Sequence, residues 1–290
     1  MTNPTATAAT SRDPKVVLIT GTSSGIGLAA AVAAARAGFT TVATLRDPQR
    51  ADALREAAEE AGVELDIRRL DVTDAASVAA CVAGVVADHG RLDAVVNNAG
   101  AGHVGTLENE SVDDVRQVME VNFFGVVQVA KAALPHLRAT GGRLVTVTSV
   151  GGVIGQPFNE AYCAAKFAVE GYLESLAPVA ASVGVTVSVV EPGAVASAFV
   201  ANVGVDADQA VTEAGPYAPA LQAYLARTRA TFASAAQTPQ GAADTVIEAL
   251  TAERPAFRLQ TSEAARQFVG IKLADLDGSA AQAFTTAWIA

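Results

Sequence analysis

The chain has 290 residues, about half of them apolar, and a formal net charge of −10. This length allows a substantial buried core, whereas the acidic balance and the scattered basic residues argue against nucleic acid as a partner. No uncharged apolar run reaches the roughly 18 residues that a membrane-spanning helix needs, so no membrane span is expected. The three histidines show no clustered ligand spacing, and no metal site is expected either.

The amino-terminal stretch MTNPTATAATSRDPK consists of small and polar residues. Residues 1–14 are expected to form a disordered tail, because they lack the apolar core of a secretion signal. The chain contains only two cysteines, Cys81 and Cys163. Few cysteines and no secretion signal fit a reducing compartment, so the predicted location is cytoplasmic.

From residue 15 onward, short apolar runs alternate with alanine-rich helical stretches. Strands are predicted at 15–20, 40–45, 63–70, 92–100 (with its exit loop), 142–149, 184–193 and 256–261. Helices are predicted at 25–38, 48–61, 74–88, 111–139, 159–177 and 238–252. This alternation indicates βαβ units and an α/β fold, a doubly wound parallel sheet with helices on both faces. No linker interrupts the pattern, so residues 15–290 are predicted to form a single domain.

Residues 194–237 break the rhythm by mixing apolar, acidic and turn residues. A long insertion after the carboxyl end of a strand is a common place for a substrate lid, which is the prediction for this segment. A pair of surface helices joined by loops is the alternative. The remainder of the chain, which carries Phe268, Phe284 and Trp288, is expected to be helical and docked.

The first predicted strand runs directly into TGTSSGIG, residues 20–27. Gly21, Gly25 and Gly27 allow a tight turn and let a pyrophosphate approach the backbone, while the following helix offers free N–H groups and a positive dipole end. The strand–loop–helix context makes this loop a stronger signal for a dinucleotide site than its glycines alone.

The end of the second predicted strand decides between two dinucleotides. An NAD site usually offers a carboxylate there, but this strand ends at Leu45 and Arg46 follows. Arg46, helped by Thr44, could hold a 2′-phosphate, so NADP(H) is favoured. The alternative is that Asp47 binds the ribose and makes the protein an NAD enzyme, although Asp47-Pro48 is typical of a helix start.

Polar side chains follow the other strands at their carboxyl ends, where doubly wound sheets bind ligands. Asp71 could accept a hydrogen bond from an adenine amino group, or cap a helix that begins near Thr73. The asparagines of NNAG, residues 97–100, can tie the loop backbone to neighbouring strands and contact a cofactor ribose. His103, just beyond, either lines a substrate entrance or is a solvated loop histidine.

In this order and spacing the motifs resemble the short-chain dehydrogenase/reductase family. The matching parts, within residues 15–195, are TGTSSGIG at 20–27, Asp71, NNAG at 97–100, Asn122 in VNFFG, Ser149, the YxxxK pair Tyr162 and Lys166, and PG at 192–193. Their joint occurrence by chance is negligible, unlike that of any single motif. The segments LITGTSSGIGLA, ATLRD and SVGGVIGQPFNEAYCAAKFAVEGYLESLA are most similar to the 17β-hydroxysteroid dehydrogenase type 1 and retinol dehydrogenase branch, which mostly prefers NADP(H).

The resemblance implies a Rossmann-type fold and a catalytic set of Asn122, Ser149, Tyr162 and Lys166. Tyr162 would exchange a proton with the substrate oxygen, Ser149 would position that oxygen, and Asn122 would hold a water that links Lys166 to solvent. A phenol with a pKa near 10 is a poor base at neutral pH, so the Lys166 ammonium is expected to lower that pKa and also to bind the nicotinamide ribose.

The cofactor-binding residues that follow from the glycine loop, the strand ends and the resemblance form one set. They are Gly21, Ser23, Ser24, Gly25, Ile26, Gly27, Arg46, Asp71, Asn98, Ala99, Gly100, Tyr162, Lys166, Pro192, Gly193, Val195 and Ser197. Ser197 replaces a threonine that contacts the nicotinamide carboxamide in many relatives, and a serine hydroxyl can do the same.

The expected function is NADP(H)-dependent hydride transfer between nicotinamide and a small hydrophobic ketone or secondary alcohol. A sugar-nucleotide epimerase shares the Ser/Tyr/Lys set but usually has GxxGxxG, whereas the glycines here fall at 21, 25 and 27. A cofactor-binding sensor without turnover would typically lack the tyrosine or the lysine. The resemblance further implies a homodimer or homotetramer that pairs through helices 111–139 and 160–182.

Overall fold

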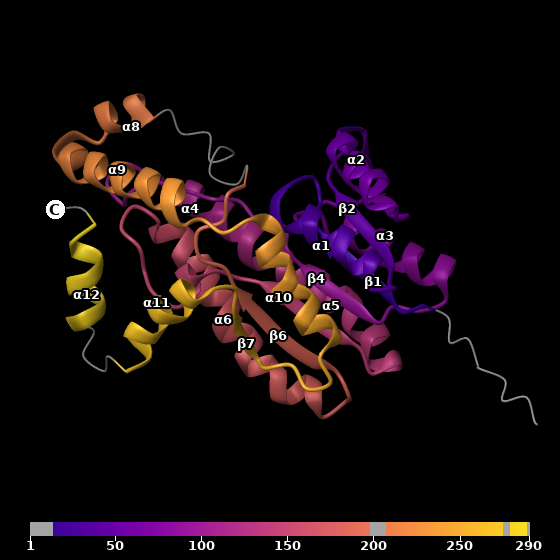
Figure 1. The fold of residues 1–290 in the computed structure, drawn as a ribbon. Helices are drawn as coiled ribbons and strands as arrows, with labels where there is room; N and C mark the ends of the chain where they lie inside the picture. Colours follow the sequence, from indigo (N-terminus) through magenta and orange to yellow (C-terminus); the bar gives the residue numbers. More distant parts are fainter. Residues whose placement is uncertain (1–13, 198–206, 275–278, 289–290) are drawn as a thin grey trace, which may run out of the picture.

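The computed structural model describes residues 14–197, 207–274 and 279–288, so the predicted tail lies almost entirely outside the described residues. At its centre is a seven-stranded parallel sheet with the order β3-β2-β1-β4-β5-β6-β7 (Figure 1). Its strands are β1 (Val16–Thr20), β2 (Thr40–Leu45), β3 (Asp66–Arg69), β4 (Ala94–Asn97), β5 (Arg143–Val147), β6 (Thr186–Glu191) and β7 (Arg258–Gln260). The predicted α/β class with a doubly wound sheet is confirmed.

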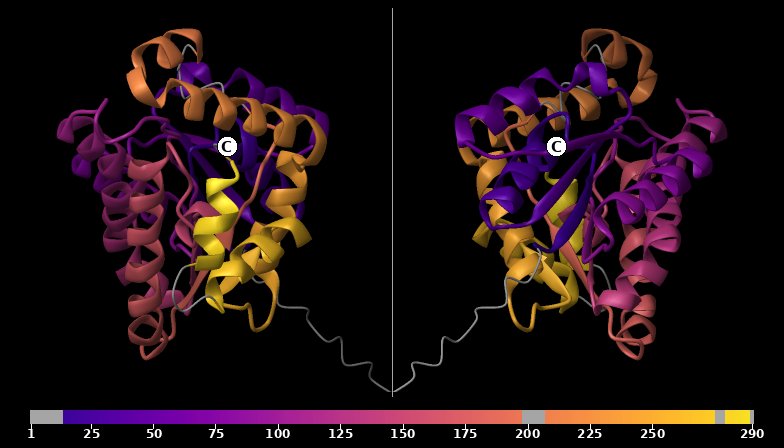
Figure 2. Two further views of the ribbon diagram at one scale, coloured as in Figure 1. Left: turned by 90° about the vertical axis from the view of Figure 1, so that its left-hand side faces the viewer. Right: turned by 90° about the vertical axis from the view of Figure 1, so that its right-hand side faces the viewer.

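The central strands are buried along nearly their whole length because helices cover both faces of the sheet. In β1, Val16 and Leu18 point into one core, and Val17 and Ile19 point into the other. The first core is closed by α3 (Ala75–His89), α5 (Gly125–Thr140) and α6 (Glu160–Ala181), and the second by α1 (Gly25–Arg36), α2 (Asp52–Ala61) and α10 (Pro239–Thr251). Figure 2 shows the pink helices of the first layer and the indigo and orange helices of the second on opposite sides of the sheet.

The predicted helix 111–139 is interrupted in the structure. It consists of α4 (Val112–Met119), a π-helical turn η2 (Glu120–Phe124) and α5. The widened turn contains Asn122, whose side chain is fully buried. Single π-turns inside helices occur often at functional sites, and no periodicity in the sequence indicates this one.

Several predicted boundaries differ from the structure, two of them on either side of α2. The helix predicted from residue 48 is a short 3₁₀ turn, η1 (Pro48–Arg50), followed by α2. The strand predicted at 63–70 is limited to β3, which lies at the edge of the sheet and pairs only with β2. An edge strand lacks one neighbour, so its ends are less constrained by pairing.

The segment predicted as a lid is helical from Ala207 to Ala235, and residues 198–206 lie outside the described part. It contains α8 (Ala207–Glu213), the 3₁₀ turn η4 (Gly215–Tyr217) and α9 (Ala218–Ala235). Its base is fixed where Ala196 N donates to Gln237 O at 2.9 Å and Gln237 N donates to Ala194 O at 3.0 Å. The two ends of the segment therefore meet at the end of β6.

The carboxyl-terminal residues form α11 (Glu263–Leu273) and α12 (Ser279–Thr286), and α12 lies below the amino-terminal half of α9 in Figure 1. Phe268, Phe284 and Trp288 pack against one another, with ring centroids 5.7–6.0 Å apart. The guanidinium of Arg227, from α9, lies 5.0 Å from the Trp288 ring centroid. The prediction of a helical, docked tail is confirmed for the described residues. None of the described helices is both long and apolar enough to cross a membrane.

Candidate active site

The loop between β1 and α1 (Gly25–Arg36) forms a cradle that depends on its glycines. Gly21 and Gly25 have positive φ angles of 71° and 59°, which other residues rarely adopt. A Cβ atom on Gly27 would lie 2.2 Å from Gly21 O and 2.3 Å from Asn98 Nδ2. The glycines are therefore required by the fold of the loop, and they leave its N–H groups open at the start of α1, as a pyrophosphate needs.

The NNAG segment after β4 holds this cradle in place. Asn98 Nδ2 donates to Thr20 O at 3.0 Å and to Gly21 O at 2.9 Å. Thr20 Oγ1 in turn accepts from the backbone N–H groups of Asn98 and Ala99, each at 3.0 Å. The predicted tie between the asparagine loop and a neighbouring strand is confirmed for Asn98. Thr20, the first residue of the glycine motif, is a structural member of the site that the sequence analysis did not single out.

Arg46 is exposed directly after β2, where the predicted adenosine end of the cofactor would lie. Asp47 caps η1 by accepting from Gln49 N at 3.0 Å, so the predicted helix start is confirmed. The expected help from Thr44 is wrong, because Thr44 is fully buried and donates to Ile19 O at 3.0 Å. At the end of β2, Arg46 is thus the residue whose positive charge is available to a phosphate group.

Asp71 lies close to Arg46. Burial alone would raise the pKa of Asp71. Hydrogen bonds from Thr73 and the charges of Arg46 and Arg69 outweigh burial and hold this pKa below its usual value. The alternative that Asp71 caps a helix beginning near Thr73 is wrong, because α3 begins at Ala75 and is capped by Asp74. Asp71 instead closes the preceding turn by accepting from Thr73 N at 3.0 Å and from Thr73 Oγ1 at 2.8 Å.

Ser149 and Tyr162 meet at the carboxyl end of β5. Ser149 begins the 3₁₀ turn η3 (Val150–Gly152), and its Oγ accepts from Gly151 N at 2.9 Å. The Tyr162 hydroxyl, from the first turn of α6, is hydrogen-bonded to Ser149. Two hydroxyls thirteen residues apart in sequence are thus joined, in an arrangement that can bind a single carbonyl or alcohol oxygen.

Lys166 lies one turn beyond Tyr162 and is only 4% exposed. Its Nζ donates to Val147 O at 3.3 Å. A Cβ on Gly100 would lie 2.9 Å from Asn122 Oδ1 and 3.5 Å from Lys166 Nζ, so these three residues from separate elements surround one small space. Asn122 is held there by hydrogen bonds to the backbone of Ala101 and Val118.

Burial dominates the electrostatics of this pair. It raises the pKa of Tyr162 well above its usual value, and the hydrogen bond with Ser149 opposes this shift. It also lowers the pKa of Lys166 to about 8, against the opposing charge of Glu170. The net shift of the phenol pKa is therefore upward and not downward as expected, because the cost of burying a phenolate dominates.

The exit from β6 completes the edge of the site. Pro192 O accepts from Val150 N at 3.0 Å, which joins the PG segment to the turn that carries Ser149. Val195 is buried, and Gly193 and Ser197 are partly exposed. A Cβ on Gly25 would lie 3.2 Å from the Cβ of Ser197, so the predicted carboxamide contact lies against the glycine cradle.

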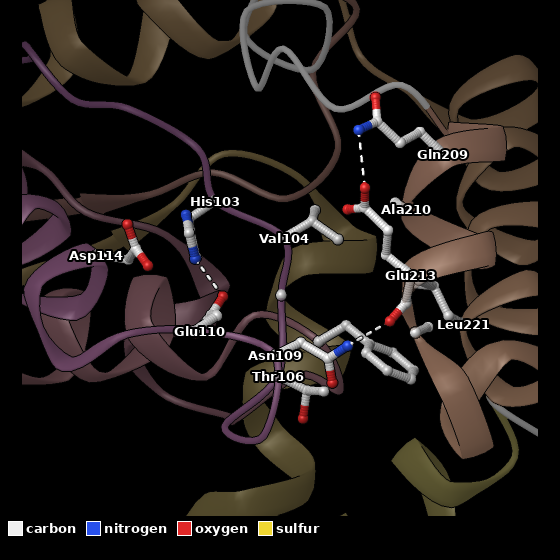
Figure 3. A pocket seen from close by; sticks show the side chains of 13 residues that line it. His103, Val104, Thr106, Asn109, Glu110, Asp114, Gln209, Ala210, Glu213 and Leu221 are labelled. Atoms are coloured by element: carbon white, nitrogen blue, oxygen red, sulfur yellow. Dashed lines mark hydrogen bonds and ion pairs between the residues drawn. The ribbon is translucent and has the colours of Figure 1, made fainter.

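His103 lines a pocket of about 460 Å³ between the loop after β4 and helices α8 and α9 (Figure 3). Its ring is paired with Glu110, and the two side chains are 24% and 9% exposed. His103 is thus a partly buried, paired loop residue and not a freely solvated one. Phe158 also borders this pocket and has a φ of 58°, unusual for a residue other than glycine. Such a backbone is found where the surroundings impose it, and the sequence carries no signal for it.

The glycine cradle lies where the strand order reverses, and the polar groups gather at the carboxyl ends of the strands. These features define a Rossmann-type dinucleotide-binding protein, and the open cradle fits a dinucleotide pyrophosphate. The model of the family described as short chain dehydrogenase matches residues 15–208, and the chain belongs to this family of oxidoreductases. Among the described residues, no group of three or more His, Cys, Asp or Glu side chains could hold a metal ion.

Two relatives match nearly the whole chain. Human 17-beta-hydroxysteroid dehydrogenase type 1 is 40% identical over 273 residues, 91% of this chain and 82% of its own. Retinol dehydrogenase 8 of Bos taurus is 38% identical over 274 residues, 92% of this chain and 87% of its own. The predicted family and branch are thereby confirmed.

Solved structures agree on the fold and on the class of cofactor. An alcohol dehydrogenase from Thermococcus sibiricus complexed with 5-hydroxy-NADP has a TM-score of 0.68 and 28% identity, over 85% of this chain and 95% of its own. A short chain dehydrogenase/reductase from Burkholderia phymatum in complex with NAD has a TM-score of 0.77 and 25% identity, over 91% of this chain and 95% of its own. These complexes support a nicotinamide dinucleotide as the cofactor.

Proposed function

We propose that the protein is an NADP(H)-dependent oxidoreductase that interconverts a hydrophobic ketone and the corresponding secondary alcohol. The observation that carries this proposal is the hydrogen-bonded pair of Ser149 and Tyr162, with the buried Lys166 one turn away. Proton transfer to a carbonyl oxygen needs a donor and a second group that fixes the oxygen, and these two hydroxyls are such a set.

In this proposal Tyr162 donates its proton to the substrate oxygen during reduction and takes it back during oxidation. Ser149 donates a hydrogen bond to that oxygen and fixes its place. Lys166 binds ribose hydroxyls and stabilises negative charge on the Tyr162 oxygen, and Asn122 holds a water that carries protons between Lys166 and solvent. The nicotinamide cofactor, when bound, supplies or accepts the hydride.

The cofactor is held by the remaining predicted residues. The cradle of Gly21, Ser23, Ser24, Gly25, Ile26 and Gly27 receives the pyrophosphate, and Asn98, Ala99 and Gly100 border the ribose. The edge formed by Pro192, Gly193, Val195 and Ser197 receives the carboxamide. Asp71 faces the adenine, and Arg46 binds the 2′-phosphate. The exposed guanidinium of Arg46 and the capping role of Asp47 support a preference for NADP(H) over NAD(H).

The substrate class is proposed to be hydrophobic because the two relatives are named for retinol and a hydroxysteroid. Residues 194–237 are proposed to act as its lid within a single domain, 15–290. The apolar cluster of Phe158, Leu221 and Tyr224 supports this role, since it joins α9 to the turn that precedes Tyr162. A cytoplasmic location is proposed as well, in agreement with two cysteines that are both free and buried.

A screen for cofactor oxidation tests the proposal. NADPH and NADH are each incubated with steroids, retinal, aliphatic ketones and acyl-carrier ketoesters, and loss of nicotinamide absorbance is followed. Turnover with a hydrophobic carbonyl supports the proposal. Tight cofactor binding without turnover on any member of the panel would instead identify a cofactor-binding sensor.

A further inference from the structure

A buried carboxylate lies next to the proposed catalytic lysine. Glu170 follows Lys166 by one turn on α6, and its side chain is only 6% exposed. Its Oε1 accepts from Thr148 Oγ1 at 2.6 Å, and its Oε2 accepts from Arg258 Nε at 3.2 Å. A carboxylate is costly to bury unless its charge is used or compensated, and none of the roles above accounts for Glu170.

Arg258, on β7, connects this carboxylate to a second one. Its Nε lies 3.4 Å from Oε1 of Glu191, which is fully buried at the end of β6, directly before Pro192. Gln260 Nε2 donates to the other oxygen of Glu191 at 2.8 Å. Arg258 also pairs with Glu174 at 3.1 Å, but Glu174 is 61% exposed. The charge cluster thus extends from the proposed catalytic helix to the edge that would hold the nicotinamide.

The charges of the cluster balance when Lys166 and Glu170 are both ionised or both neutral, so the two groups depend on each other. Lys166 and Arg258 supply two positive charges, and the buried carboxylates Glu170 and Glu191 supply two negative ones. If Glu170 is neutral, the dry interior holds an excess positive charge, which favours loss of the Lys166 proton. The groups are therefore coupled, and their protonation belongs to the cluster rather than to single residues.

We propose that Glu170 is a positioning residue of the reaction, which together with Arg258 keeps Lys166 in its ammonium form inside the closed site. This role rests on the proposed function, in which the Lys166 charge acts on Tyr162 and on the cofactor ribose. Glu170 touches neither substrate nor cofactor and acts through Lys166.

Packing holds Glu170 in this position. A Cβ on Gly152 would lie 3.0 Å from Glu170 Cγ and 3.1 Å from Lys166 O, so η3 packs directly on this turn of α6. The groups that face the pair are Tyr162 and Glu174 on α6, Asn122 on η2, Thr148 after β5, Glu191 on β6 and Arg258 on β7. Burial raises the pKa of Glu170 to about 7, and the hydrogen bond from Thr148 and the charge of Arg258 oppose this shift. The pKa values of Lys166 and Glu170, about 8 and about 7, thus both lie near neutral pH.

The test is the pH dependence of kcat/KM for carbonyl reduction. In the wild type, activity is expected to fall as the pH rises through the Lys166 pKa of about 8, because the ammonium is lost. Glu170→Gln removes the negative charge but keeps the shape, and it is expected to move this alkaline limb to lower pH by about one unit. Glu174→Gln removes the exposed partner of the same arginine on the same helix and is expected to leave the limb unchanged.

Two further measurements make the result decisive. Thr148→Val removes the hydrogen bond that favours the ionised Glu170 and leaves the number of charged groups unchanged, so the limb is expected to move in the same direction. This variant decides the matter if Glu170→Gln does not fold. The pH dependence of NADPH affinity, followed by nicotinamide fluorescence, is expected to shift in parallel and needs no substrate. A folded Glu170→Gln with the wild-type limb and the wild-type binding profile would overturn the inference. Absence of turnover in the wild type would instead overturn the proposed function, and the binding profile would still decide the role of Glu170.

Discussion

The ammonium nitrogen of Lys166 lies 5.7 Å from the centroid of the Tyr162 ring, and the two residues lie on successive turns of α6. Because burial raises the phenol pKa, Tyr162 remains protonated over the neutral range and is suited to donate a proton. The positive charge nearby stabilises the phenolate that donation leaves behind. In the proposed reaction, the wild type is therefore expected to donate this proton to a carbonyl oxygen at neutral pH.

Tyr162→Phe is expected to lower kcat by about 100- to 10,000-fold, the range that proton transfer by a positioned side chain supplies. The ring still packs against α4, so NADPH affinity is expected to stay within about twofold of the wild type. Steady-state kinetics and fluorescence titration measure the two quantities. Tyr172→Phe, at an exposed tyrosine of the same helix, is the matched control and is expected to be active. Turnover near that of the wild type in Tyr162→Phe would rule out the proton-transfer role.

Lys166→Met is expected to reduce both cofactor affinity and turnover, because it keeps the buried stem and removes only the charge. Loss of a hydrogen bond from a charged group costs about 1.5–3 kcal/mol, or roughly 10- to 100-fold in Kd. NADPH titration and kcat/KM measure the losses, and thermal unfolding shows whether the variant is folded. If a folded Lys166→Met variant binds NADPH with the Kd of the wild type, Lys166 does not bind the ribose.

The sheet could be predicted from the sequence because its central strands are mostly apolar runs between turn residues. Residues 40–45 match β2, and the glycine loop has the expected strand and helix on its two sides. The π-turn at Asn122 could not be predicted, because an extra residue in one turn leaves the apolar pattern of the helix nearly intact. The same holds for Phe158, whose positive φ is imposed by packing and not by its residue type.

Within the site, motif spacing brought together Ser149, Tyr162 and Lys166, but it did not predict their electrostatics. Desolvation depends on what covers a side chain, and Lys166 is covered by elements that are distant in sequence. The partnership of Glu170 with Arg258 joins residues 88 positions apart in the sequence. Neither the burial of Lys166 nor the pairing of Glu170 with Arg258 follows from a short sequence motif, so both are found only in the folded structure.

A homodimer or homotetramer is expected to form through α5 and α6. Phe124, Tyr172, Val179 and Val183 are exposed on or beside these helices, and Phe123 packs its ring between those of Phe124 and Tyr172. Exposed apolar residues gathered on one face are typical of an interface. Light scattering at micromolar concentration is expected to give at least twice the monomer mass. Val179→Glu is expected to lower that mass, whereas Leu107→Glu, at an exposed leucine outside these helices, is the control and should not. A monomeric wild type would contradict the expectation.

The choice of cofactor is expected to depend on Arg46. Its guanidinium is exposed after β2 and can make charge-assisted hydrogen bonds to a 2′-phosphate. Arg46→Ala is therefore expected to weaken NADP(H) by about 1.5–3 kcal/mol and to leave NAD(H) nearly unchanged. Leu45→Asp is a less clean test, because Leu45 is only 4% exposed and a carboxylate there would also carry a cost of burial.

The measurement is kcat/KM with both cofactors, for the wild type, for Arg46→Ala and for Arg50→Ala. Arg50 is an exposed arginine at the end of η1, and its variant controls for the general loss of positive charge. Specificity is a difference between two affinities, so the decisive quantity is the ratio of the NADP and NAD values. A fall in that ratio for Arg46→Ala alone supports a direct phosphate contact, since Asp47 caps η1 in either case. Equal losses with both cofactors, or a wild type that prefers NAD, would show that Asp47 or another group binds the ribose diol instead.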